Sequence, residues 1–366
     1  MSLQVGIVGL PNVGKSTLFN ALTATAAAQA ANYPFCTIEP NVGRVAGPDD
    51  RLEKLATIAK SQKIIPTQLG FVDIAGLVRG ASRGEGLGNQ FLANIREVDA
   101  IIHVLRCFED SDITHVEGSI NPVRDAETVE TELMLADLDS VEKRVINTQK
   151  KAKGGDKESK ELLAVLEPVL EVLKAGRPAR SVELDADLRP LLARQQLLSA
   201  KPVVYVCNVE ESAAVNGNAF SAQVAEFAAK EGNAAVVISA AIEAEVSQLT
   251  DPADQAEFLQ SLGLEETGLT RVIRAGYKLL DLLTFFTVGP KEARAWTVRR
   301  GAKAPEAAGV IHTDFEKGFI RAETIAYADF IACNGETGAK EAGKMRLEGK
   351  EYLVQDGDVF HFLFNV

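Results

Sequence analysis

The residues with the clearest chemistry lie near the start of the chain, in the run GLPNVGKS at positions 9–16. This run matches the pattern G-x-x-x-x-G-K-S. In such a loop the glycines let backbone N–H groups point at phosphate oxygens, Lys15 adds a positive charge, and the Ser16 hydroxyl offers Mg²⁺ an oxygen ligand. The motif therefore predicts a site for a nucleoside triphosphate and Mg²⁺. The predicted nucleotide-binding residues of the loop are Asn12, Val13, Gly14, Lys15, Ser16 and Thr17.

The segments that flank this loop predict the elements that position it. Residues 3–8 (LQVGIV) are typical of a short buried strand, and residues 16–25 (STLFNALTAT) are typical of a helix. The N-terminal end of a helix carries partial positive charge and unpaired N–H groups, which attract an anion. A chance match to the loop pattern is the alternative, and both flanking segments disfavour it.

Two further positions complete the predicted magnesium site. Asp73 ends the apolar segment 67–73, where it would hold Mg²⁺ through water. Thr37 lies between the loop and this strand, and it is the candidate for a second hydroxyl ligand on a mobile switch segment. The alternative is that an aspartate ends the strand, and a threonine sits in the loop, for turn geometry alone. The predicted metal ligands are Ser16, Thr37 and Asp73.

The residues after Asp73 predict slow hydrolysis. The N–H of Gly76 would meet the γ-phosphate, but Leu77 stands where many GTPases place a water-orienting glutamine. A leucine cannot orient water, so a partner or another side chain must supply that group. His115 is our candidate because imidazole can position water, or accept its proton, near neutral pH. An exposed loop histidine without a role is the alternative. The predicted catalytic residues are His115, Lys15 and Gly76.

Recognition of the base depends on the run Asn208-Val209-Glu210-Glu211. Guanine-specific P-loop proteins carry Asn-Lys-x-Asp at this point, and their aspartate pairs with the guanine ring NH and amino group. Losing one charged hydrogen-bond pair costs about 1.5–3 kcal/mol, enough to cancel a preference for guanine. The Asn208 amide could instead pair with the N6/N7 edge of adenine, whereas the alternative for Glu210 and Glu211 is a solvated loop. The predicted base-site residues are Asn208, Val209, Glu210, Ser239 and Ala240.

Composition excludes several classes of protein. A chain of 366 residues predicts two or three domains, and 46% hydrophobic with 25% charged residues is typical of a soluble protein. We expect a cytoplasmic protein without a membrane segment, because no run of 18 uncharged apolar residues and no secretion signal occurs. The net charge of −12 argues against general nucleic-acid binding, and no specific DNA partner is expected. The four cysteines form no C-x-x-C pair, which predicts free thiols.

The remaining strand signals predict the fold. Apolar segments at 67–73, 100–106, 202–207 and 235–239 alternate with helical segments. Near-continuous apolar strands separated by helices indicate a parallel sheet covered on both faces, the doubly wound α/β class. We therefore expect a nucleotide-binding domain of the P-loop NTPase type over residues 1–280.

Two segments depart from this alternation. Apolar residues at helical spacing on either side of Gly154-Gly155 predict an antiparallel helical hairpin, inserted over residues 127–198. Seven basic residues against two acidic ones between Lys143 and Lys160 make its tip basic, for which a solvated helix face is the alternative. Alternating segments after residue 280 predict a small β-rich domain over 281–366.

These residues resemble the translation-factor-like P-loop NTPases and, more closely, the YchF family, also called Obg-like ATPases. The resemblance covers essentially the whole chain. It implies a cytoplasmic switch with an OBG-type nucleotide-binding domain and a C-terminal domain similar to a TGS domain. It also implies Mg²⁺-dependent hydrolysis of ATP to ADP and phosphate, with GTP weaker or comparable, and association with the ribosome or ribosomal RNA. The motifs that carry it are GLPNVGKS at 9–16, YPFCTIEPN at 33–41, DIAGLVRGAS at 73–82 and NVEE at 208–211.

The sequence also allows two other interpretations of the function. One is a guanine-specific GTPase of the Obg type, which would differ only in the base site. The other is a nucleotide-binding scaffold with negligible turnover, which Leu77 makes credible. In addition, Asn12 resembles the potassium ligand of cation-dependent relatives, so K⁺ is a second candidate cofactor beside Mg²⁺. An asparagine favoured by turn geometry is the alternative.

Overall fold

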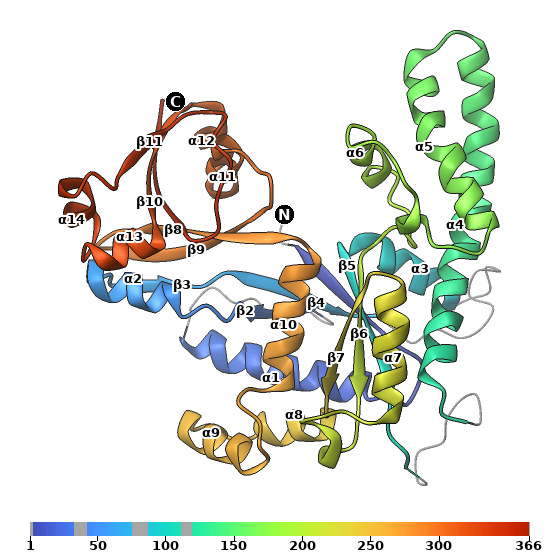
Figure 1. Ribbon diagram of the computed structural model, residues 1–366, viewed down its shortest axis with the longest axis horizontal. Coiled ribbons are helices and arrows are strands. Elements are labelled where there is room, and N and C mark those ends of the chain that lie inside the picture. Colours follow the sequence, from blue (N-terminus) through green and yellow to red (C-terminus); the bar gives the residue numbers. More distant parts are fainter. Residues whose placement is uncertain (1–2, 33–41, 75–86, 111–118, 366) are drawn as a thin grey trace. The chain divides into compact units, whose positions relative to one another are not determined.

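The computed structural model describes residues 3–32, 42–74, 87–110 and 119–365 (Figure 1). The chain divides into two compact units. The first comprises residues 1–27, 38–43 and 70–276, and the second comprises residues 28–37, 44–69 and 277–366. Residues 44–69, which the sequence places within the first domain, thus pack with the C-terminal part of the chain.

The first unit is built on a six-stranded sheet in the order β2-β4-β1-β5-β6-β7. β1 pairs in parallel with β4 and β5, and β6 pairs in parallel with β5 and β7. Every residue of β5 and β6 is buried, which explains their continuous apolar sequence. The strands are β1 (Gln4–Val8), β2 (Val42–Ala46), β4 (Gln68–Asp73), β5 (Ala100–Arg106), β6 (Val203–Asn208) and β7 (Ala234–Ile238).

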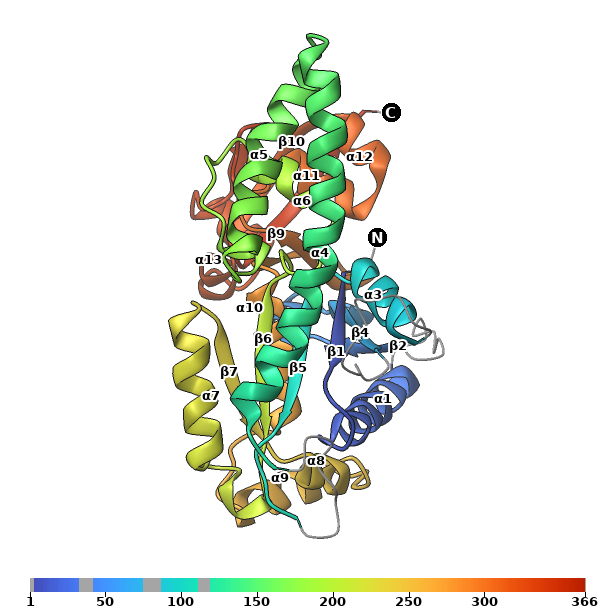
Figure 2. The same cartoon turned by 90° about the vertical axis from the view of Figure 1, so that its right-hand side faces the viewer.

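Helices cover both faces of this sheet, which confirms the predicted doubly wound class. α4 and α7 contact the strands from one face, and α1 lies on the other (Figures 1 and 2). None of the described helices is long and apolar enough to cross a membrane. The helices around this sheet are α1 (Lys15–Asn32), α3 (Leu87–Glu97), α4 (Pro122–Lys153), α7 (Ala219–Lys230), α8 (Ala240–Val246), α9 (Pro252–Ser261) and α10 (Gly268–Leu279).

A helical hairpin projects from the first unit (Figure 2). It consists of the C-terminal half of α4 and the whole of α5 (Lys157–Lys174). Buried valines and leucines of both helices form its core. α4 begins before the expected residue 127, because Asn121 caps it by accepting a hydrogen bond from the Arg124 N–H at 3.0 Å and a proline occupies the first turn. The tip turns at Gly155 with φ of 94°.

Buried polar groups fix the base of the hairpin. The Asp137 carboxylate of α4 accepts hydrogen bonds from the N–H groups of Leu198 (2.9 Å) and Ser199 (2.8 Å) and from the Ser199 hydroxyl (2.7 Å). Arg180, in the 3₁₀ helix η2 (Ala179–Ser181), donates to Glu130 of α4 at 2.7 Å. Burial raises the pKa of both carboxyl groups. The chain then passes through α6 (Arg189–Ala193) into β6, so the hairpin is tied to the strand that leads to the nucleotide site.

The second unit is β-rich, as predicted, and its sheet has the order β11-β10-β12-β8-β9-β3. Phe285 and Phe286 are successive residues of β8 and enter separate cores on the two faces, as the alternation of a strand requires. The strands are β3 (Lys63–Ile65), β8 (Leu282–Val288), β9 (Glu292–Arg299), β10 (Phe319–Ala326), β11 (Arg346–Glu348) and β12 (Asp358–Phe364). The helices are α2 (Arg51–Ala59), α11 (Ala304–Ile311), α12 (Thr313–Lys317), α13 (Tyr327–Ala332) and α14 (Glu336–Glu341).

α2 and β3 complete this second core. β3 pairs in parallel with β9, and Leu52 and Leu55 of α2 pack in the same cluster as Phe286. The sequence does not reveal this assignment, because an amphipathic helix shows which of its faces is buried but not which sheet buries it.

Candidate nucleotide-binding site

The predicted phosphate loop connects β1 to α1. Val13 is buried and anchors the loop, whereas Asn12 and Gly14 adopt left-handed backbone conformations with φ of 62° and 92°. A Cβ at position 14 would also overlap the side-chain nitrogen of Asn208. The second glycine of the motif is therefore required by both the backbone and its surroundings.

Lys15 and Asp73 meet beside this loop. Lys15 is the first residue of α1, and Asp73 ends β4, whose register with β1 places it opposite Ile7. The Lys15 ammonium group donates to the Asp73 carboxylate in a close ion pair. The two predicted site residues, 58 positions apart, thus share one location at the carboxyl edge of the sheet.

The oxygen atoms at this location suit a magnesium ion. Ser16 and Thr17 are exposed in the first turn of α1, and neither hydroxyl forms a hydrogen bond within the described part of the chain. Hydroxyl and carboxylate oxygens are the ligands that Mg²⁺ prefers, together with phosphate oxygens and water. The donor set of Ser16 and Asp73 therefore fits the predicted ion.

Asn208 connects three segments of the site. Its side-chain nitrogen donates to the Val13 carbonyl at 3.0 Å, and its side-chain oxygen accepts from the Ala240 N–H at 2.8 Å. The side chain is buried. The amide that the sequence analysis considered for the adenine edge is thus engaged with the backbone of the phosphate loop and of α8, where it fixes both.

The other predicted base-site residues lie around Asn208. Val209 is buried and donates its N–H to the Ile238 carbonyl at 2.8 Å. Ser239 is buried at the end of β7, and its hydroxyl has no hydrogen-bond partner among the described residues. The loops after β6 and β7 therefore stand side by side, as a base site between them requires.

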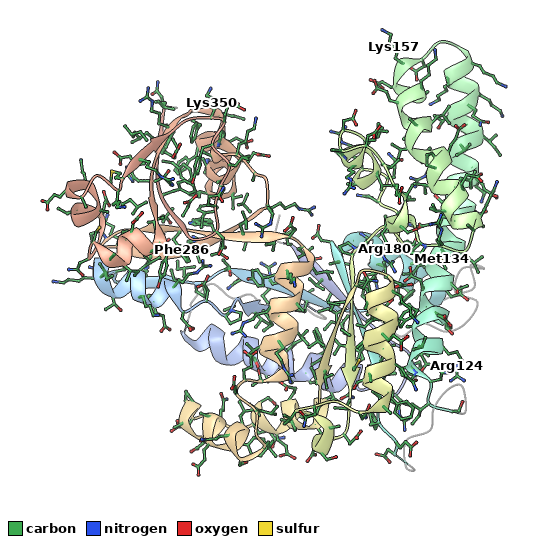
Figure 3. All side chains as sticks on the ribbon, in the orientation of Figure 1. Arg124, Met134, Lys157, Arg180, Phe286 and Lys350 are labelled. Carbon is green, nitrogen blue, oxygen red and sulfur yellow. The ribbon has the colours of Figure 1, made fainter. Side chains whose placement is uncertain are left out.

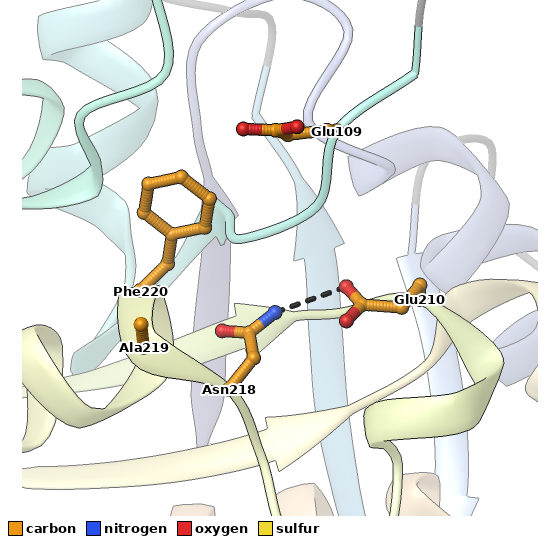
Figure 4. A pocket seen from close by; sticks show the side chains of 5 residues that line it. All are labelled: Glu109, Glu210, Asn218, Ala219 and Phe220. Atoms are coloured by element: carbon orange, nitrogen blue, oxygen red, sulfur yellow. Dashed lines mark hydrogen bonds between the residues drawn. The ribbon is translucent and has the colours of Figure 1, made fainter.

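The Glu210 side chain reaches the start of α7. Its carboxylate accepts a hydrogen bond from the Asn218 side chain at 2.9 Å. Both residues line an open cavity of about 260 Å³ with Glu109, Ala219 and Phe220 (Figure 4). The cavity lies at the carboxyl edge of the sheet, where β5 and β6 end.

Asn218 and Arg106 are polar residues of this edge that sequence reasoning missed. The guanidinium group of Arg106 is buried and donates to the carbonyls of Phe108 and Asp110, both at 3.2 Å. A helix start at Asn218 is visible in the sequence as an N-x-x-S cap ending at Ser221. Its contact with the loop after β5 is not visible, because those residues are 111 positions apart.

Three predicted residues lie outside the described ranges, namely Thr37, Gly76 and His115, as does Leu77. Their assigned roles remain predictions. Of the four cysteines, Cys107, Cys207 and Cys333 are described and carry free thiols, as expected.

Comparison with known proteins decides the family. The chain is 62% identical to the ribosome-binding ATPase YchF of Haemophilus influenzae, and the 366 aligned residues cover all of both chains. The chain belongs to the YchF family. It is also 54% identical to the YchF protein of Bacillus subtilis, again over the full length of both.

Family models and solved structures agree with this assignment. The model for the YchF C-terminal region, described as a protein of unknown function, matches residues 282–365, and a model described as a 50S ribosome-binding GTPase matches residues 4–174. The YchF GTPase of Schizosaccharomyces pombe superposes with a TM-score of 0.88 at 37% identity, covering 99% of this chain and 98% of that one.

Proposed function

We propose that this protein is a ribosome-associated switch that hydrolyses ATP to ADP and phosphate with Mg²⁺. The observation that carries the proposal is the convergence of Lys15, Asp73 and Asn208 on one phosphate loop. The names of the relatives, ribosome-binding ATPases at up to 62% identity, support both the reaction and the partner. The cytoplasm is the proposed location.

Each residue of the site has a proposed role. Lys15 and the backbone N–H groups of residues 12–17 hold the phosphates, and Gly76 meets the γ-phosphate. Ser16, Thr37 and Asp73 hold Mg²⁺, which when bound neutralises charge on the β- and γ-phosphates. His115 orients the attacking water in place of the absent glutamine. The left-handed backbone of Asn12 alone accounts for an asparagine there, so a role for K⁺ rests on the family resemblance only.

The base site favours ATP over GTP in this proposal, or accepts both. Val209 is apolar and buried where guanine-specific proteins carry lysine, which supports the loss of one charged contact. Asn208 borders the base from a fixed position, because both ends of its amide are held by backbone groups. The family model and the yeast structure carry the word GTPase in their descriptions, so a guanine-specific reaction is the second candidate.

The hairpin tip is the proposed contact with ribosomal RNA. Lys143 already pairs with Asp139 at 2.7 Å, and Arg144 donates to the Gln195 carbonyl at 3.0 Å. The lysines beyond them are exposed and form no salt bridge within the described part of the chain, and Figure 3 shows Lys157 at the far end. Clustered ammonium groups bind phosphates and release counterions. The proposed contact residues are Lys150, Lys151, Lys153, Lys157 and Lys160.

Nucleotide titrations test the proposal. The purified chain should bind a fluorescent ATP analogue, hydrolyse ATP slowly, and lose binding in the variant Lys15→Ala. Competition by unlabelled ATP and GTP then decides the base, because a much stronger effect of GTP would favour the second candidate. Binding without any phosphate release, with and without ribosomes, would favour the scaffold.

A further inference from the structure

We propose that Asn218 is a positioning residue of the nucleotide site: it holds residues 107–110, after β5, and residues 209–211, after β6, together so that they form a fixed wall beside the base. The inference rests on the proposed nucleotide-binding function. It concerns a residue outside the phosphate loop and outside the NVEE run, at the start of α7.

Asn218 makes more contacts than a helix cap needs. Its side-chain oxygen accepts from the Ser221 N–H at 3.0 Å, which caps α7. Its side-chain nitrogen donates to the Cys107 carbonyl at 2.6 Å and to the Glu210 carboxylate at 2.9 Å. Aspartate and serine cap helices as well as asparagine does, so capping alone does not require an amide. The amide NH2 group carries two donors, one for each loop, whereas an ionised aspartate carries none and serine carries one.

These contacts continue inward to the phosphate loop. The Cys107 N–H donates to the Asn208 carbonyl at 2.8 Å, and the Asn208 side chain donates to the Val13 carbonyl at 3.0 Å. The cap of α7 and the phosphate loop are therefore the two ends of one series of hydrogen bonds. Arg106 holds the segment after β5 from the buried side, because it donates to the carbonyls of Phe108 and Asp110.

The residues around Asn218 depend on it to different degrees. Asn208 is also held by the Ala240 N–H, and Val209 by the Ile238 carbonyl, so both stay in place without Asn218. Glu210 is exposed, and its hydrogen bond to Asn218 is its one described side-chain hydrogen bond. Loss of the amide nitrogen therefore frees Glu210 and the Cys107 carbonyl while the phosphate loop keeps its contacts. The result is a defect in binding the base but not the phosphates.

The variant Asn218→Asp separates these effects. The carboxylate still caps α7, but it donates no hydrogen bond and repels Glu210. Affinity for ATP should fall about tenfold, because binding must then order the freed segment, which costs about 1.4 kcal/mol. Affinity for Mg²⁺-tripolyphosphate, which carries the phosphates without a base, should stay within about twofold of the wild-type value. Competition against a fluorescent ATP analogue measures both.

Asn121→Asp is the matched control. Asn121 caps α4 in the same way, through its side-chain oxygen and the Arg124 N–H, but its side-chain nitrogen donates to no described group. This variant should bind ATP like the wild type. Circular dichroism checks that both variants are folded. If Asn218→Asp does not fold, Glu210→Ala tests the same contact from the other side and should show the same selective loss.

Two results would overturn the inference. One is an unchanged ATP affinity in folded Asn218→Asp or Glu210→Ala. The other is an equal loss of ATP and tripolyphosphate affinity, which would mean that Asn218 supports the fold of the whole site. Failure of the proposed function looks different, because then the wild-type chain itself would not bind ATP or would bind it equally after Lys15→Ala.

Discussion

His103 makes the first unit sensitive to acid, and this sensitivity can be predicted in magnitude. The residue lies in the middle of β5, it is buried, and its Nε2 atom has no hydrogen-bond partner among the described residues. Its ring lies 5.8 Å from the ring of Tyr205 on the neighbouring strand. Burial lowers the pKa of His103 from 6.5 to about 3, so the imidazole is neutral in the folded protein.

The sign of the effect follows from this shift. Unfolding exposes the imidazole and restores its ordinary pKa, so below pH 6.5 the unfolded chain binds a proton that the folded chain does not. The stability that His103 contributes is thus complete above pH 6.5 and is lost as the pH falls toward 3. At pH 5 the loss is about 2 kcal/mol, since 1.5 pH units at about 1.4 kcal/mol each separate pH 5 from the ordinary pKa.

The variant His103→Phe removes this proton site and keeps an aromatic ring beside Tyr205. Urea unfolding followed by circular dichroism, at pH 7 and pH 5, should show that the wild type loses about 2 kcal/mol more than the variant. The single tryptophan, Trp296, lies in the second unit, so its fluorescence reports that unit separately. His103→Leu repeats the test if the phenylalanine does not fit. An equal loss of stability in the wild type and both variants would refute the reasoning.

Three other substitutions test the site, the hairpin base and the tip. Gly14→Ala should lower ATP affinity at least about tenfold, because a left-handed alanine costs about 1–2 kcal/mol and its Cβ overlaps Asn208; a near-normal value in a nucleotide titration would contradict this. Asp137→Ala should lower the urea midpoint of the first unit by the equivalent of about 2–4 kcal/mol, since it leaves two buried N–H groups without partners, whereas a change below about 0.5 kcal/mol would contradict it. Replacing Lys150, Lys151 and Lys153 with glutamine should reduce the slope of log ribosome affinity against log salt by about 2–3, and an unchanged slope would remove the tip from the contact.

The sequence was sufficient for features that depend on neighbouring residues. The phosphate loop, the continuous apolar strands β5 and β6, and the helical hairpin follow from local pattern, because each pattern matches the period of one element. The caps at Asn121 and Asn218 are local patterns as well, but our predictions did not include them. The predicted start of the hairpin was less accurate. The periodicity of apolar residues placed it at residue 127, whereas α4 begins at Pro122.

The sequence was insufficient where distant segments pack together. Val209 and Glu210 are neighbours in the NVEE run, yet Val209 is buried against β7 while Glu210 contacts the start of α7. The amide of Asn208 could have read the base directly, but the fold places two backbone groups within its reach. Such pairings depend on which strands lie side by side, and a single sequence does not state that order.

The sequence by itself determined that this protein has a triphosphate loop, a parallel sheet behind it and an altered base motif, because these features are written in residue type and spacing. Only the tertiary structure decided that α2 and β3 belong with the C-terminal sheet, that Asn208 ties the phosphate loop to α8, and that Asn218 joins the segments after β5 and β6. The physical reason is that a buried polar group must find a partner, and the identity of that partner depends on the packing of the whole unit.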